Sequence, residues 1–296
     1  MTRLAGMMAK SAVAPLDRLK ILMQSNCPHY SRFNLWSCYR AVLNKEGFLS
    51  FYKGNGAAMI RVFPYAAIQY TAYELFRPLM RALMGPHSHI GNFTAGAAAG
   101  TVAVTSTYPL DIVRTRLAFQ VKGEHVYYGI MNALQKMFHE NGWRAYYKGY
   151  AATVAGILPY SGSSFYFFDL SKRIMLKYFP KQTTTVNEEK GGRLELSIWA
   201  KLICGCLSGV IAQTAAYPVD VIRRRMQLIG MHPAYDHYNT AMWRVGVIVY
   251  HEEGMSAFYR GLSLNYVRAI PMVGISFTAF EFFKQLLRIE EHAPTS

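Results

Sequence analysis

The sequence predicts an all-α membrane protein, with six transmembrane helices in three pseudosymmetric two-helix repeats and short amphipathic helices between them. Two observations carry this prediction. Of the 296 residues, 52% are hydrophobic, 14% are aromatic and only 17% are charged, which is an apolar balance for a chain of this length. Three different motifs also recur three times along the chain, which indicates that one supersecondary unit is used repeatedly.

The first motif has the form Pro-x-Asp-x-x-basic and occupies 15–20, 109–114 and 218–223. A proline inside a spanning helix removes a backbone hydrogen bond and kinks the helix, and neighbouring groups in a bundle can satisfy the freed carbonyl. The acid and the base are costly in hydrocarbon unless they face the interior and find opposite charges. We therefore predict three bent odd-numbered helices that direct these charges inward.

Two further motifs define the second half of each unit. An aromatic-basic-Gly motif occurs at 52–54, 147–149 and 259–261. In each copy another glycine lies seven residues before the glycine of the motif. An aromatic-acidic-x-x-basic motif occurs at 73–77, 168–172 and 280–284. The second helix of each unit is expected to join the two motifs over 57–77, 151–172 and 262–284, which is long enough to span a bilayer. Polar amphipathic segments are expected near 33–46, 128–141 and 236–252.

These boundaries divide the chain into three repeats and one linker. We expect the repeats at 1–80, 88–178 and 197–288, and a polar linker at 179–196 between the second and the third. Small-residue patterns such as Gly96 to Gly100 suit closely packed helices in lipid. In the first repeat the matching pattern falls at the very start of the chain, so helix 1 is expected to be shorter by about two turns than its counterparts.

The charges of the proline motifs are predicted to form a ring that closes one mouth of a central path. Because three copies allow a closed circle, we pair each base with the acid of the following repeat: Lys20 with Asp111, Arg114 with Asp220, and Arg223 with Asp17. Two glutamines nine residues after the prolines are expected to strengthen this ring by hydrogen bonds: Gln24 and Gln227.

The charges of the even-numbered helices are predicted to form a second ring at the other mouth. Its acids are Glu74, Asp169 and Glu281, and its bases are Arg77, Lys172 and Lys284. The hydroxyl of Tyr73 is available to strengthen it, whereas the second and third repeats have phenylalanine at that position. A cavity that can be closed at either end is a transport path.

Between the two rings, residues that break the threefold pattern are candidates for substrate binding. Arg61 and Arg268 occupy matching positions three residues before a proline of the even helices, and both are predicted to contact an anion. Lys10 is a further cation without a counterpart in the other repeats, and we expect it to face the same cavity.

Composition and motifs exclude several other classes of protein. The net charge of +15 indicates an anionic partner, which on charge alone could be nucleic acid, acidic lipid or a phosphorylated small molecule. Nucleic acid is disfavoured because the bases recur singly, with acids, inside apolar helices. The four cysteines and the histidines show no metal-ligand spacing, and no phosphate loop or nucleophile motif indicates an enzyme.

The three proline motifs and the aromatic-basic-Gly motifs resemble those of the mitochondrial carrier family, over residues 2 to about 285. The resemblance implies a multi-pass, monomeric carrier of the mitochondrial inner membrane that works by alternating access. It also implies that the proline ring and the short helices face the matrix, and that the short helices hold cardiolipin. No other cofactor is expected.

By position, the family's central contact points fall on Arg61, on the pair Gly156 and Ile157, and on Arg268. A Gly-aliphatic pair is typical of family members that carry adenine-containing substrates. Runs such as 117–125 and 259–266 are similar to a subgroup associated with coenzyme A import, which makes coenzyme A the expected substrate. An exchanger of ADP, ATP or adenosine 3′,5′-bisphosphate, or a non-transporting or proton-leak member whose shortened helix 1 prevents gating, remains as an alternative.

Overall fold

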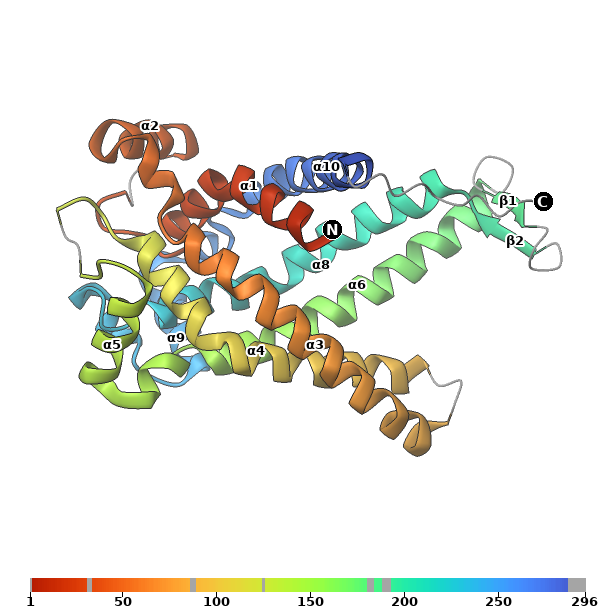
Figure 1. Cartoon of the computed structure of the whole chain (residues 1–296), viewed down its shortest axis with the longest axis horizontal. Helices are drawn as coiled ribbons and strands as arrows, with labels where there is room; N and C mark the ends of the chain where they lie inside the picture. The colour runs from red at the N-terminus through yellow and green to blue at the C-terminus, as the bar shows by residue number, and fades with distance from the viewer. Residues whose placement is uncertain are drawn as a thin grey trace. The chain divides into compact units, whose positions relative to one another are not determined.

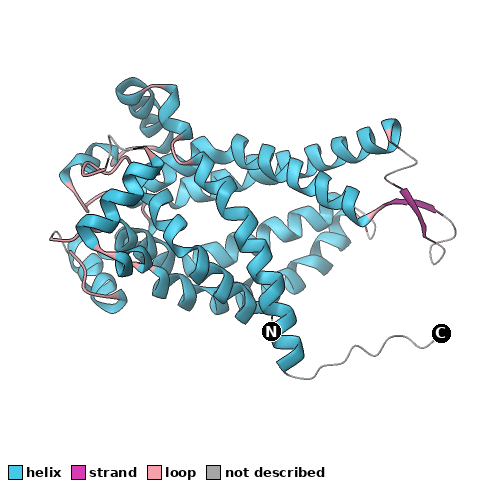
Figure 2. Cartoon of the chain, turned by 90° about the horizontal axis from the view of Figure 1, so that it is seen from above, coloured by secondary structure: helices cyan, strands magenta, loops and turns pink. Residues whose placement is uncertain are grey.

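The computed structural model describes residues 2–30, 34–85, 89–123, 126–179, 184–187 and 193–286. The chain divides into two compact units, of which unit 1 comprises Met1–Tyr150 and Ile222–Ser296, and unit 2 comprises Ala151–Val221. Figures 1 and 2 show that helices account for nearly all of the described chain.

Six long helices are present among the described residues, two from each predicted repeat. They are α1 (Thr2–Gln24), α3 (Asn55–Met84), α4 (His89–Phe119), α6 (Tyr150–Tyr178), α8 (Ile198–Gln227) and α10 (Leu262–Leu286). The motif prolines Pro15, Pro109 and Pro218 lie inside α1, α4 and α8 as predicted. The second helix of each repeat, α3, α6 or α10, extends beyond its predicted end. Helix α1 has 23 residues, compared with 31 in α4 and 30 in α8.

Short helices lie between the long ones near the predicted positions. They are α2 (Leu35–Glu46), α5 (Ile130–Asn141) and α9 (Met242–Glu253). Each leads into a 3-10 turn, η1 (Phe48–Tyr52), η2 (Gly142–Tyr147) or η5 (Met255–Tyr259), and a further 3-10 turn, η4 (Pro233–Tyr238), precedes α9.

The segment predicted as a plain polar linker contains a two-stranded antiparallel sheet. Strand β1 (Thr184–Asn187) pairs with β2 (Arg193–Leu196), with Thr184 opposite Leu196. The prediction missed it because a short polar run carries too little hydrophobic alternation to mark a strand. The rest of the predicted linker lies largely outside the described residues.

In unit 1, α3 packs along α4, and α1 packs along α10 (Figure 1). The first of these contacts depends on Gly54, which precedes α3 in a left-handed conformation at φ 80°. A Cβ on Gly54 would lie 2.6 Å from the carbonyl oxygen of Arg114 and 3.2 Å from the Cβ of Ala118. The glycine of the aromatic-basic-Gly motif is therefore required because the start of one helix touches the backbone of the next.

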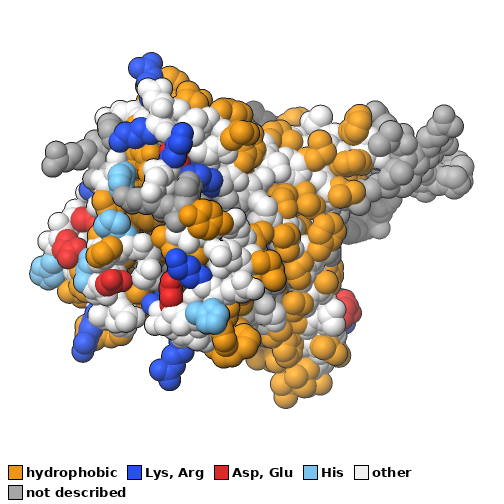
Figure 3. Space-filling model, turned by 60° about the vertical axis from the view of Figure 1, so that its left-hand side comes forward, with side chains coloured by type: hydrophobic (Ala, Val, Ile, Leu, Met, Phe, Trp, Pro, Cys, Tyr) orange, Lys and Arg blue, Asp and Glu red, His pale blue; other side chains and the backbone are white. Residues whose placement is uncertain are grey.

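The short helices cover one end of the long helices in unit 1. The apolar face of α5 buries Ala133 and Met137 against Ile112 and Val113 of α4, in a cluster completed by Tyr146 of η2. Figure 3 shows that lysine, arginine and histidine side chains gather over the end that carries the short helices, while hydrophobic side chains cover the flank of the long helices. This end, which also holds the proline motifs, is called the proline-motif end below.

Length and hydropathy alone would identify one spanning helix among the described residues, Trp199–Gln227. The charges carried by the repeated motifs lower the mean hydropathy of the other long helices. The repeats, and not the hydropathy of single segments, are thus the informative feature of this sequence.

Candidate functional site

Two aspartates of the proline motifs organise the interior of unit 1. Asp17 of α1 accepts a hydrogen bond from Arg114 Nη2 at 2.6 Å on Oδ2 and another from Arg268 Nη1 at 2.5 Å on Oδ1. The Asp17 side chain is only 14% exposed. Helices α1, α4 and α10 are therefore joined by charge-assisted hydrogen bonds at one carboxylate.

Asp111 of α4 is the second centre and is more deeply buried, with 2% of its surface exposed. Its Oδ2 accepts hydrogen bonds from Arg223 Nη2 at 2.5 Å and from the amide of Gln227 at 3.0 Å. Its Oδ1 is ion-paired with Arg61 Nη1. The carboxylate thus ties α4 to α3 and to the last turns of α8.

These pairs contradict the predicted direction of the ring. Arg114 pairs with Asp17 and Arg223 with Asp111, so each of these bases meets the acid of the preceding repeat rather than the following one. Lys20, predicted to meet Asp111, donates to Asn265 Oδ1 at 2.9 Å. The motif spacing is the same for both directions, and only the order of the packed helices decides which neighbour a side chain faces.

One of the two predicted glutamine braces is present. Gln227 donates to Asp111, and its Oε1 accepts hydrogen bonds from Thr115 at 3.0 Å and from Arg224 at 2.9 Å. Gln24 is fully buried, but neither its Nε2 nor its Oε1 has a hydrogen-bond partner in the described part of the chain. The predicted hydrogen bond from Gln24 to the ring is therefore not formed among the described residues in this arrangement.

The predicted substrate arginines are not isolated cations. Arg61 pairs with Asp111 and also donates to Thr107 Oγ1 at 3.3 Å, while Arg268 pairs with Asp17. Both side chains retain partial exposure, 19% and 29% respectively. The two arginines are therefore held by the same carboxylates that hold the ring, which sequence reasoning did not foresee.

Lys10 differs from these arginines. It makes no hydrogen bond or ion pair with any described residue, although the charges of Arg61, Arg114 and Arg268 act on it. The carboxylate of Asp17 acts on Lys10 as well, but the three guanidinium groups outnumber it, and such an excess of positive charge attracts an anion.

The remaining predicted contact point lies in unit 2. Gly156 and Ile157 are half-buried on α6, where a Cβ on Gly156 would lie 3.4 Å from Cγ1 of Val219. Asp220, the third aspartate of the proline motifs, follows Val219 on α8 in the same unit.

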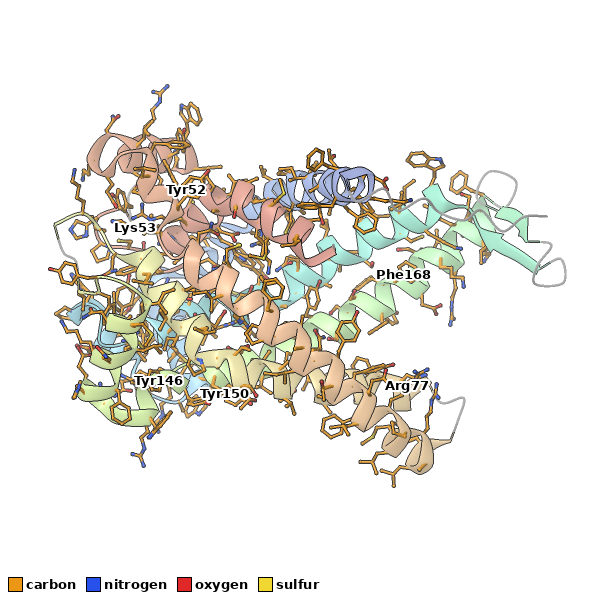
Figure 4. The ribbon with its side chains drawn as sticks, in the orientation of Figure 1. Tyr52, Lys53, Arg77, Tyr146, Tyr150 and Phe168 are labelled. Carbon is orange, nitrogen blue, oxygen red and sulfur yellow. The ribbon has the colours of Figure 1, made fainter. Side chains whose placement is uncertain are left out.

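The residues predicted for the second ring lie at the other ends of the even helices. In Figure 4, Lys53 lies just before α3 at the proline-motif end and Arg77 lies near the far end of that helix. Arg77 stacks its guanidinium over the Tyr73 ring at 5.9 Å, while Glu74 and Glu281 are exposed and form no ion pair with a described residue.

In unit 2, Asp169 pairs with Arg173 on its own helix at 2.8 Å, beside the exposed Lys172. Lys284 completes the predicted set and is half-buried on α10. Of the acids predicted for the second ring, Glu74 and Glu281 thus pair with no described base, and Asp169 pairs within its own helix.

Sequence reasoning missed a second layer of buried charge at the proline-motif end. Arg18 is 1% exposed and donates to Glu46 at 2.7 Å and to the carbonyl oxygens of Ala118 and Gln120. Lys53 donates to Glu46 at 2.8 Å. Although burial raises the pKa of Glu46, the hydrogen bond from Lys53 and the charge of Arg18 outweigh it and hold this pKa below its ordinary value.

The third repeat carries an equivalent cluster. Arg225 donates to Glu253, which also accepts from Arg260 Nη1 at 2.9 Å, and Arg225 further donates to the hydroxyl of Tyr238 at 2.7 Å. The sequence did carry a signal for these clusters: the residue just before Gly47 in the first repeat and Gly254 in the third is glutamate in both cases.

Comparison with known proteins gives this geometry its family. The model of the family described as mitochondrial carrier protein matches three segments of the chain, residues 2–82, 85–179 and 194–291. The chain belongs to the mitochondrial carrier family. It is accordingly a multi-pass carrier of the mitochondrial inner membrane, and not an enzyme.

Individual carriers are similar over nearly their whole length. Human solute carrier family 25 member 16 is 44% identical, covering 97% of this chain and 86% of the relative. The mitochondrial coenzyme A transporter SLC25A42 of Xenopus tropicalis is 39% identical over 96% of this chain and 84% of that protein. The maize mitochondrial carrier protein CoAc2 is 37% identical, with 99% of this chain and 87% of the relative covered.

Proposed function

We propose that this carrier moves coenzyme A across the mitochondrial inner membrane, and that Arg61, Arg268 and Lys10 bind the phosphate groups of the substrate. The observation that carries the proposal is the charge arrangement of unit 1. Arg61 and Arg268, each partly exposed, pair with the two aspartates that join the helices, and Lys10, which has no ion-pair partner among the described residues, lies within the electrostatic reach of Asp17. One of the similar carriers is named as a coenzyme A transporter.

The pairing of the arginines supplies a coupling between binding and gating. A phosphate is a stronger partner for a guanidinium than a carboxylate that is already shared, because it offers two oxygens in a bidentate geometry and more charge. Binding at Arg268 would compete with Asp17, and binding at Arg61 would compete with Asp111. Each aspartate would then keep a single arginine, Arg114 or Arg223, and the closed proline-motif end would be weakened.

This competition meets the energetic condition for a transport cycle. A substrate can shift the carrier between states only by binding one state more tightly than the other. When the proline-motif end is closed, full binding of the substrate breaks two ion pairs, Arg268 with Asp17 and Arg61 with Asp111. When that end is open, these pairs are already broken, so the substrate binds the open state more tightly. We propose that the second ring, formed by the charges of the even helices, assembles as the first ring separates.

The adenine portion of coenzyme A is proposed to contact Gly156 and Ile157. A glycine exposes its backbone, which leaves a flat surface for a purine ring. Cardiolipin at the short helices and a monomeric carrier are part of the same proposal, following the general features of the family.

The test is uptake of labelled coenzyme A into liposomes that contain the purified carrier. The variants Arg61→Ala and Arg268→Ala should each reduce uptake at least tenfold, and Lys10→Ala should raise the substrate concentration needed for half-maximal uptake. The exposed Arg144, substituted by alanine, is the matched control and should transport normally. Normal uptake by both central variants would refute the assignment of the site.

A thermal-stability panel identifies the substrate class independently of transport. Ligands that bind the folded carrier raise its melting temperature, and at equal concentration the ligand that binds more tightly raises it further. Coenzyme A should give a larger rise than dephospho-coenzyme A, ADP, ATP, adenosine 3′,5′-bisphosphate or phosphate. A larger response to ADP or ATP would favour the adenine nucleotide exchanger, and no response to any ligand would favour a non-transporting member.

A further inference from the structure

The two arginines of the proposed site make the same contact twice in unit 1. Arg61 of α3 pairs with Asp111 of α4, and Arg268 of α10 pairs with Asp17 of α1. Each arginine lies three residues before a proline of its own helix, and each aspartate lies two residues after a motif proline. The surroundings of the two pairs can therefore be compared position by position.

The Arg61 guanidinium has a second partner on α4. Its Nε donates to Oγ1 of Thr107 at 3.3 Å. Thr107 is 1% exposed, and its hydroxyl donates to the carbonyl oxygen of Ala103 at 2.8 Å. Because the single hydrogen of the hydroxyl is used in that bond, its oxygen presents a lone pair to Arg61. Arg61 is thus held at two nitrogens by Thr107 and Asp111, which lie one helical turn apart.

The ring of Tyr65 holds the same guanidinium from within α3. Tyr65 lies four residues after Arg61, so the two side chains are neighbours on one face of the helix. The guanidinium carbon lies 5.3 Å from the centroid of the ring, which is within the range of a cation–π interaction. A carboxylate, a hydroxyl and an aromatic ring therefore all act on Arg61.

Arg268 has neither the hydroxyl nor the ring. On α1, the residue four positions before Asp17 is Val13, which is 3% exposed and carries no polar atom in its side chain. On α10, the residue four positions after Arg268 is Met272. Asp17 is the one described residue with which Arg268 forms a hydrogen bond or ion pair, and Arg268 is the more exposed of the two arginines.

This difference decides how easily each guanidinium can change its partner. A planar guanidinium that is held at Nε keeps its orientation while its Nη1 changes from one oxyanion to another. A phosphate that approaches Arg61 therefore meets a donor that is already oriented, and pre-organisation of this kind strengthens binding. Arg268 is held at one nitrogen only, so it can turn away from Asp17 toward a phosphate at a lower cost.

We propose that Thr107 is a positioning residue that makes Arg61 the fixed phosphate contact of the site. Arg268 lacks such a residue and is the contact that moves first, from Asp17 to the substrate. This inference rests on the proposed function, because it assigns different roles to two arginines of the same site. The two ion pairs break in a set order, with the pair of Arg268 before the pair of Arg61.

The first test removes the hydroxyl that holds Arg61. Uptake of labelled coenzyme A into liposomes is measured over a range of substrate concentrations. Thr107→Val keeps the shape of the side chain and should raise the concentration for half-maximal uptake about three- to tenfold, which is the effect of losing a typical hydrogen bond. The maximal rate should not change. Thr107→Ser restores the hydroxyl and should restore the half-saturation concentration.

The second test supplies the missing hydroxyl to Arg268. In Val13→Thr the new hydroxyl can donate to the carbonyl oxygen of Ala9, four residues earlier, as the hydroxyl of Thr107 does on α4. Its oxygen then holds Arg268 beside Asp17 in the closed arrangement. The maximal rate of uptake should therefore fall about three- to tenfold.

Thr101→Val is the matched control on α4. The hydroxyl of Thr101 donates to the carbonyl oxygen of Ala97 at 2.8 Å and contacts no arginine of the described chain. This variant should transport with wild-type kinetics. Thermal denaturation of every variant checks the fold, since a merely structural role for Thr107 would lower the melting temperature without moving the half-saturation concentration.

Two results would overturn the inference while the proposed function stands. They are an unchanged half-saturation concentration in Thr107→Val and an unchanged maximal rate in Val13→Thr, each in a carrier that takes up coenzyme A and loses uptake in Arg61→Ala. If Thr107→Val does not fold, the rate of Val13→Thr decides alone. A folded wild-type carrier that takes up no coenzyme A would refute the proposed function, and this inference with it.

Discussion

The direction of the aspartate ring can be tested by a double-mutant cycle around Asp111. The structure pairs this carboxylate with Arg223 and Arg61, whereas motif order alone pairs it with Lys20. Asp111→Asn leaves two arginines without their acid in a site where the aspartate is 2% exposed. Removing one member of a buried ion pair costs about 3–5 kcal/mol, so the single variant should lose stability of that order.

The coupling energies separate the two arrangements. Residues in direct contact couple by about 0.5–3 kcal/mol, and we expect the upper part of that range for Asp111→Asn with Arg223→Gln. The effects of Asp111→Asn and Lys20→Gln should add to within about 0.5 kcal/mol, as for residues that share no partner.

The measurement is the free energy of unfolding of the detergent-purified carrier and its variants in a chemical denaturant. Both cycles use the same Asp111 variant, so that general damage to the site cancels between them. Strong coupling with Lys20 together with additivity for Arg223 would show that the observed pairing is incorrect.

Three further outcomes follow from the same contacts. Gly54→Ala should lower the free energy of unfolding by more than about 2 kcal/mol, because strain at positive φ adds to overlap with the Arg114 carbonyl. Gly85→Ala, at φ 91° in open space, should be destabilised by the backbone strain alone. Thermal denaturation compares the two variants. Because the pKa of Glu46 is lowered in the fold, the stability that it contributes should be full above its ordinary value of 4.5 and lost as pH falls below it. The difference in stability between wild type and Glu46→Gln should therefore become smaller below that pH. A difference that does not change with pH would argue against the ion pair. Lys10→Ala should weaken coenzyme A binding in a titration without lowering stability, unlike Arg268→Ala, which breaks a pair with Asp17.

The sequence by itself determined the repeats, the six long helices and the family. These properties are local: a proline, an aspartate and a base at fixed spacing recur whatever the helices touch, and recurrence is visible without a structure. The positions of α2, α5 and α9 followed from the same spacing, to within a few residues except at the start of α9.

Tertiary structure alone decided the partners of the charges. Whether Asp111 meets Lys20 or Arg223 depends on which face of each helix turns toward which neighbour, and identical motifs carry no information about that choice. The same is true of Arg61 and Arg268, whose attachment to the ring aspartates arises from residues 50 and 251 positions apart in the chain.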